Sequence, residues 1–249
     1  MEEIISEACS KGFTVWGFTP HGPISIDSSC NMKKEMVKDY LKEIQRLRRQ
    51  FPQIKILAGM EVDLIDEFNG PSSPEVKEYG LDYVIGSVHF IPNQQGIYHD
   101  IDGSPDRFKK YLNDFFENDL DYVVRTYWNQ VQRMIKAGGF DIIGHIDKIA
   151  LNASSIDPEI EEKKIYSELA EKTIQMAIES GKAIEINTKH WEKYKRFFPH
   201  PRYWKTILDK GILMPVNSDT HYADKVESGM QEANLYLLNI ASSPNHLQM

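Results

Sequence analysis

Residues 12–23 read GFTVWGFTPHGP and join a short apolar run to a histidine. The run at 13–19 contains the aromatic and β-branched residues that favour a strand, and a Gly-Pro turn follows at 22–23. His21 therefore lies just beyond the carboxyl end of a predicted buried strand. The same arrangement recurs along the chain, and this repetition is the basis of the fold and site predictions.

Five further runs have the same character. They are short and almost continuously apolar, as strands buried on both faces are: IKILAGM at 54–60, DYVIGSV at 82–88, DIIG at 141–144, AIEIN at 183–187 and ILMPVN at 212–217. Amphipathic segments between them predict helices over 32–51, 106–137 (two helices), 157–181 with Asp157 as N-cap, and 200–210. Alternation of strands and helices predicts an α/β fold with a parallel sheet, either doubly wound or closed as a barrel. No linker interrupts it, so one domain is expected over residues 1–249.

The first predicted element is a helix over 2–11, which leads into the strand at 13–19. A strand–helix repeat normally begins with a strand. The pattern therefore predicts that the first strand of the sheet is missing from this chain.

Residue types that bind metals follow most of the predicted strands. Five of the six strand ends are occupied in this way, by His21, Glu61, His89, His145, and the pair Asp219 and His221. The exception is the strand at 183–187, which ends on Asn187-Thr188 and holds Glu185 inside it. In a barrel the carboxyl ends of the strands meet at one mouth. Imidazoles and carboxylates there predict a site for two or more zinc, manganese or iron ions, which can clamp a phosphate ester.

Each of these residues taken alone has an ordinary structural explanation. A single histidine is more often hydrogen-bonded in a loop or core, Glu61 could be a loop acid, and the Ser218-Asp219-Thr220 segment could be a helix N-cap. The metal-site interpretation depends on their repetition at the same end of successive strands. The remaining histidines follow no such pattern, and solvated loop or tail positions are predicted for His99, His190, His200 and His246.

Composition limits the class of protein. The chain has 249 residues, of which 41% are hydrophobic, and a formal net charge of −8 without a long basic run, which disfavours binding to nucleic acid or to a membrane surface. No signal peptide and no apolar run of roughly 18 residues is present. Cys9 and Cys30 form no CxxC pair, so a cytoplasmic protein is expected. The GxSxG, P-loop and GxGxxG motifs are absent.

Six motifs in order carry a resemblance to a known family: GFTPHGP, GMEVD, GSVHFI with a downstream DID, GHIDKI, EINT and NSDTH. Together they resemble the polymerase and histidinol phosphatase (PHP) superfamily, and within it the histidinol-phosphatase branch, over about residues 2–240. The resemblance implies a distorted (β/α)7 TIM-like barrel with a trinuclear metal centre at its mouth. It also implies a metal-dependent phosphomonoesterase that hydrolyses L-histidinol phosphate in histidine biosynthesis.

The resemblance also implies roles for individual residues. Glu61 would bridge two metals, His89 and His145 would complete the set of the second metal, Asp219 would belong to the first, and His21 and His221 would hold the third. The attacking water would bridge two metals held by Glu61 and Asp219. A basic residue after EINT would grip the phosphate, for which Arg196 and Lys189 are the candidates. Asp63, Asp147 and Glu185 are candidates for outer-shell or acid–base roles.

One departure from the family pattern leaves alternatives open. The family begins with a strand that ends in His-x-His, and this chain has no such motif. We expect a start site further upstream; loss of part of the centre is the competing explanation. The site could therefore act on another small phosphate ester or a nucleotide, or the protein could be a catalytically silent metal-binding remnant.

Overall fold

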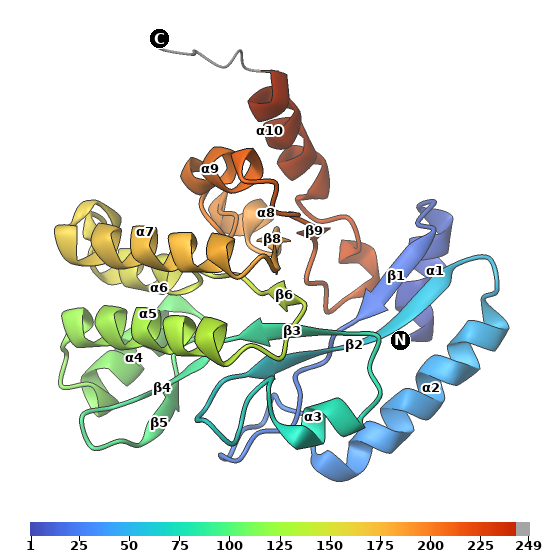
Figure 1. Ribbon diagram of the computed structural model, residues 1–249, viewed down its shortest axis with the longest axis horizontal. Coiled ribbons are helices and arrows are strands. Elements are labelled where there is room, and N and C mark those ends of the chain that lie inside the picture. The colour runs from blue at the N-terminus through green and yellow to red at the C-terminus, as the bar shows by residue number, and fades with distance from the viewer. Residues whose placement is uncertain (243–249) are drawn as a thin grey trace.

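A curled parallel sheet forms the centre of the protein (Figure 1). The computed structural model describes residues 1–242, with side chains as far as residue 240. Five strands pair in the order β1-β2-β3-β6-β7, and β8, one residue beyond β7, pairs in parallel with β9. Their bounds are β1 Val15–Phe18, β2 Lys55–Asp63, β3 Tyr83–Ser87, β6 Ile142–Ile143, β7 Ala183–Ile184, β8 Ile186–Asn187 and β9 Val216–Asn217. The predicted α/β fold with a parallel sheet is confirmed.

One edge of this sheet is formed by β1, which pairs with β2 from Val15 opposite Lys55 to Phe18 opposite Ala58. Within residues 1–242 no strand pairs with the other edge of β1. The existence of a strand before β1 stays a prediction.

The helices lie outside the sheet. In Figure 1, α4 to α7 cover one part of it, whereas α1 and α2 lie near β1 and β2. The α-helices are α1 Glu2–Ser10, α2 Val37–Gln50, α3 Pro74–Glu78, α4 Pro105–Phe115, α5 Leu120–Ala137, α6 Ile149–Ile156, α7 Lys164–Glu179, α8 Trp191–Tyr194, α9 Trp204–Asp209 and α10 Met230–Ser242. Short 3₁₀ turns occupy Lys34–Met36, Ile160–Glu162, Pro201–Tyr203 and Ala223–Lys225.

The longest helix, α5, shows how the sequence builds the core. Asp119 caps it, because its Oδ1 accepts a hydrogen bond from the backbone N–H of Tyr122 at 2.9 Å. One face of α5 is buried, and Val123, Tyr127 and Trp128 on it are at most 1% exposed. Their burial against the sheet and α7 contributes about 2–3 kcal/mol for each large side chain. The predicted pair of helices over 106–137 is confirmed as α4 and α5.

Other predicted boundaries are wrong. The helix predicted from Asp157 begins only at Lys164, because Asp157 turns its Oδ1 to the backbone N–H of Glu159 and a 3₁₀ turn intervenes. A hairpin of β4 (Phe90–Pro92) and β5 (Tyr98–Asp100) follows His89 and has no counterpart in the prediction, nor do α6 and α10. Among residues 1–242 no helix has the length and apolar character to cross a membrane.

Candidate metal centre

The carboxyl ends of four neighbouring strands place their side chains at one edge of the sheet. Glu61 and Asp63 lie in the last three residues of β2, and His89 follows β3 by two positions, as His145 follows β6. His21 continues the line of β1, where it bridges to Glu61 while the Glu61 N–H bonds to the carbonyl of Pro20 at 3.0 Å. Parallel pairing in register therefore brings these side chains together.

Glu61, His89 and His145 converge on one point. His145 Nε2 lies 2.9 Å from Glu61 Oε1 and 3.1 Å from His89 Nε2, and the remaining pair, His89 Nε2 and Glu61 Oε1, is 3.7 Å apart. Ligands of a tetrahedral zinc ion, bound at 2.0–2.1 Å, lie about 3.4 Å from one another. Three buried nitrogen and oxygen donors with these separations form one face of such a tetrahedron. The donor set thus fits a divalent metal.

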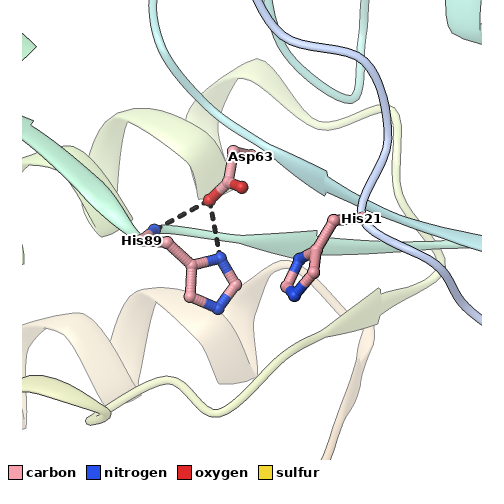
Figure 2. A group of neighbouring side chains, drawn as sticks. All are labelled: His21, Asp63 and His89. Carbon is pink, nitrogen blue, oxygen red and sulfur yellow. Dashed lines mark hydrogen bonds and ion pairs between the residues drawn. The ribbon is translucent and has the colours of Figure 1, made fainter. Parts of the chain in front are cut away.

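The residues around this triad hold it in place. Asp63 Oδ1 accepts from His89 Nδ1 at 2.9 Å, which turns Nε2 of that ring toward the centre (Figure 2). The hydroxyl of Ser87 donates to Glu61 Oε1 at 2.6 Å, and Glu185 Oε2 accepts from the backbone N–H of His145 at 2.8 Å. Asp63 is therefore placed where it orients the His89 ring, whereas Glu185 contacts only the backbone of His145, whose buried Nδ1 has no hydrogen-bond partner among the described residues.

His21 faces the second oxygen of Glu61. Its Nδ1 lies 3.3 Å from Glu61 Oε2, and its ring meets that of His89 edge-on with 5.0 Å between ring centres. His21, Asp63 and His89 also offer ligand atoms within 4.8 Å of one another (Figure 2). The two carboxylate oxygens of Glu61 are thus directed at different imidazoles, which is the geometry of a bridging ligand.

The charges in the centre favour a cation. Burial raises the pKa of Glu61, but the rings of His89, His145 and His21 outweigh burial and hold that pKa well below its usual range. Burial lowers the pKa of His89, but the carboxylates of Asp63 and Glu61 outweigh burial and raise the pKa to about 10. Carboxylates that stabilise a positive charge on a buried ring also stabilise a bound divalent ion.

Asp219 and His221, after β9, form a separate group with Lys189. Lys189 Nζ lies 3.3 Å from Asp219 Oδ2 and 3.4 Å from His221 Nε2. Asp219 has a φ of +46°, and its Oδ2 accepts from Asn187 Nδ2 at 3.0 Å. Burial raises the pKa of Asp219, but Lys189, with Lys148 and Asn187, outweighs burial and lowers it. In residues 1–242, neither Asp219 nor His221 joins a group of three convergent metal-ligand atoms.

Arg196, the other candidate for the phosphate, is engaged elsewhere. Its guanidinium makes a bidentate contact with Glu161, with Nη1 at 2.5 Å from Oε1 and Nη2 at 3.0 Å from Oε2. Nη2 also lies 3.3 Å from Asp147 Oδ2. Asp147 accepts the backbone N–H of His200 at 2.8 Å. The role of Arg196 in substrate binding stays a prediction, and in the structure this side chain ties the 189–200 loop to the turn before α7.

Sequence reasoning missed a buried ion pair beside the centre. Lys148, three residues after His145, is 6% exposed, and its Nζ lies 3.4 Å from Asp102 Oδ2. No sequence pattern selects Lys148, because in GHIDKI only His145 and Asp147 are identified as candidates. Asp102 belongs to the DID motif, and the unpredicted hairpin β4–β5 delivers it, since Ile101 N bonds to the carbonyl of His89 at 2.9 Å.

The solvated positions predicted for other histidines are wrong in three cases. His190 Nε2 is buried and has no hydrogen-bond partner among the described residues, because the ring packs edge-on against Tyr194 and Phe198. His200 is half-buried, and its Nδ1 accepts from the backbone N–H of Arg202 at 3.1 Å. His99 is also half-buried and stacks on Phe115, whereas His246 lies outside the described residues.

Comparisons with known proteins point to one family. The PHP domain family model matches residues 1–189. A protein of Schizosaccharomyces pombe named "Probable histidinol-phosphatase" is 28% identical over 95% of this chain and 80% of its own. A Listeria monocytogenes structure, assigned as the histidinol phosphatase hisK, matches with a TM-score of 0.80 at 17% identity, over 93% of this chain and 92% of its own. A Lactococcus lactis histidinol phosphate phosphatase, solved with zinc, L-histidinol and phosphate, matches with a TM-score of 0.65 at 21% identity, over 96% and 86%.

Proposed function

The chain belongs to the PHP domain family, and from this premise we propose that it is a divalent-metal-dependent phosphomonoesterase that hydrolyses L-histidinol phosphate to L-histidinol and phosphate. The observation that carries the proposal is the convergence of Glu61, His89 and His145 on one point at the mouth of the sheet. The names of the relatives support the substrate, and the zinc in the Lactococcus lactis structure supports the metal. The proposed reaction belongs to histidine biosynthesis in the cytoplasm.

The proposed centre holds two ions bridged by Glu61. One would bind Glu61 Oε1 with His89 and His145, and the other would bind Glu61 Oε2 with His21. Such ions polarise a phosphoryl oxygen and acidify a coordinated water. Asp63 holds the His89 ring by its Nδ1, and Ser87 holds Glu61, so the ligands need little rearrangement when the substrate arrives. An ion that used Asp219, predicted for the first metal, or His221, predicted with His21 for the third, would have to displace Lys189 from that residue.

Lys189 is the proposed contact for the phosphoryl group. Its side chain is 30% exposed, and its ammonium group lies beside Asp219 at distances longer than a tight charge-assisted hydrogen bond. Lys189 can therefore bind an anionic phosphoryl oxygen and lose only long contacts, such as those with Asp219. Arg196 could add a second contact only after leaving Glu161 or Asp147, because both ends of its guanidinium are engaged.

The test is phosphate release by the purified chain, stripped of metal with a chelator and reloaded with zinc, manganese or iron(II). L-histidinol phosphate, a nucleoside monophosphate and p-nitrophenyl phosphate are compared. We expect kcat/KM for L-histidinol phosphate to exceed that for the other two esters by about 100-fold. Glu61→Gln should lower it by at least about 100-fold, whereas Glu117→Gln, in the loop between α4 and α5, should not.

Two results would overturn the proposal. Faster hydrolysis of the nucleotide would assign the site to another phosphate ester. Absence of release from every ester, with metal bound, would identify a silent metal-binding protein.

A further inference from the structure

The ammonium group of Lys189 lies where an ion bound to Asp219 and His221 would lie. Its Nζ is 3.4 Å from Asp219 Oδ1, 3.3 Å from Asp219 Oδ2 and 3.4 Å from His221 Nε2. These atoms are a carboxylate and an imidazole nitrogen, the donors that zinc and manganese take. Asp219 and His221 therefore face a cationic side chain of the protein itself, that of Lys189.

The backbone holds this lysine at a defined place. Thr188, which precedes it, is fully buried, and its hydroxyl bonds to the carbonyl oxygens of Asn217 and Ser228. Asn187 links the lysine to its partner, because Asn187 Oδ1 accepts the backbone N–H of Lys189 at 3.1 Å while its Nδ2 donates to Asp219 Oδ2 at 3.0 Å. The side-chain amide of Asn187 thus holds both the backbone of Lys189 and the carboxylate of Asp219 that the lysine faces.

Asp219 and His221 line the same cavity as His21 and Glu61, but the convergent ligand groups found in residues 1–242 do not include them. In the part of the chain that the structure describes, the two groups of convergent ligand atoms are Glu61 with His89 and His145, and His21 with Asp63 and His89. His21 is directed at Glu61 Oε2 and does not converge with His221, its partner in the predicted third set. Asp219 and His221 therefore lack a third convergent protein ligand among the described residues, and the cation that they face is the Lys189 ammonium group.

We propose that Lys189 is a built-in cation that takes the place of one metal ion beside Asp219 and His221. Bound divalent ions are then confined to the Glu61 side of the centre. The proposal deepens the proposed function and rests on it for the kind of ion. An ammonium group supplies a positive charge and three N–H donors for a phosphoryl oxygen, but it cannot act as a Lewis acid.

The test counts zinc ions on the full chain by equilibrium dialysis against zinc alone, followed by elemental analysis. Lys189→Met keeps much of the length of the side chain and removes the charge. We expect it to bind one more equivalent of zinc than the wild type, and Lys189→Met combined with Asp219→Asn to lose that equivalent. Lys193→Met is the matched control, since Lys193 lies four residues further on, in α8, with its Nζ over the Tyr194 ring, and this variant should bind zinc as the wild type does.

A second measurement decides the question even if Lys189→Met fails to fold. Asp219→Asn alone should bind as many zinc ions as the wild type, because no ion depends on Asp219. Loss of one equivalent in Asp219→Asn, or equal stoichiometry in Lys189→Met and the wild type, would overturn the proposal. No phosphate ester is present in the dialysis, so failure to hydrolyse L-histidinol phosphate would refute the proposed function and leave this result standing.

Discussion

Replacing Asp63 with asparagine should weaken zinc binding while leaving the His89 ring in place. The carboxylate makes both of its hydrogen bonds through Oδ1, which accepts from the backbone N–H of His89 at 2.7 Å and from its Nδ1 at 2.9 Å. The other oxygen, Oδ2, is buried and has no hydrogen-bond partner among the described residues. An asparagine can keep its carbonyl oxygen at the Oδ1 position, so both hydrogen bonds to His89 are kept while the negative charge is removed; its NH₂ group then takes the buried Oδ2 position, where it has no acceptor among the described residues.

The expected size of the effect follows from this geometry. A carboxylate behind a ligating histidine increases the basicity of the ring, and its loss costs about 10- to 100-fold in metal affinity. That factor corresponds to about 1.4–2.7 kcal/mol in binding free energy. Asp63→Ala should do more damage, because it also leaves the buried N–H of His89 without its acceptor, at a cost of about 1–3 kcal/mol in unfolding free energy.

The assay is a zinc titration in competition with a chelating indicator, accompanied by urea unfolding of each metal-free variant. Asp141→Asn is the matched control, since Asp141 Oδ2 accepts the backbone N–H of Val84 at 2.9 Å at the opposite end of the strands. It should bind zinc as the wild type does. A Kd for Asp63→Asn within twofold of the wild type would refute the orienting role of Asp63, as would equal weakening in both variants.

Three further predictions concern stability. Tyr40→Phe removes the hydroxyl that lies 3.1 Å from the carbonyl oxygen of Phe18 and 2.7 Å from that of Gly59, so the unfolding free energy in urea should fall by about 1 kcal/mol. Tyr222 is 71% exposed, and Tyr222→Phe, as the control, should change the unfolding free energy by less than about 0.5 kcal/mol. Gly139→Ala should lower the unfolding free energy by about 2–4 kcal/mol, because φ is +84° and the new Cβ would lie 2.3 Å from Ser72 Cα. Gly181→Ala, with φ +66° and no atom within 4 Å of the new Cβ, should lower it by about 1 kcal/mol. Equal losses of unfolding free energy in the two variants would contradict the clash at Gly139. Burial, together with Arg196 and Arg202, lowers the pKa of His200 to about 4 in the folded protein. As the pH falls, His200 of the unfolded chain is therefore protonated before His200 of the folded chain. The stability that neutral His200 contributes is complete above about pH 6.5 and is lost as the pH falls towards 4. Between pH 7.5 and 4.5 the urea midpoint of His200→Asn should therefore drop less than that of the wild type. An equal drop in both proteins would count against this assignment.

Most of the sheet could be predicted because its central strands, β2 and β3, are almost wholly buried; β1 at the edge is predicted to be buried but is exposed or half-buried at three of its four residues. Each strand then reads as a short apolar run, and the polar residue that ends it stands out, as His89 does after YVIGSV. The helix start at Lys164 could not be predicted in this way, because Asp157 and Pro158 have the sequence of an N-cap, but a turn at Asp157 and a 3₁₀ turn place the helix start six residues further on. The hairpin after His89 was missed because its three-residue strands are too short to show an alternating pattern.

The same division applies to the site. The order of residues along the chain places imidazoles and carboxylates after successive strands, and parallel strands bring such ends to one edge wherever the sheet forms. Which of these side chains meet depends on the folded chain. It directs His21 at Glu61, leaves Asp219 and His221 to Lys189, and buries Lys148 against Asp102. These contacts depend on sheet curvature, loop paths and side-chain rotamers, which are set by packing between segments far apart in the chain.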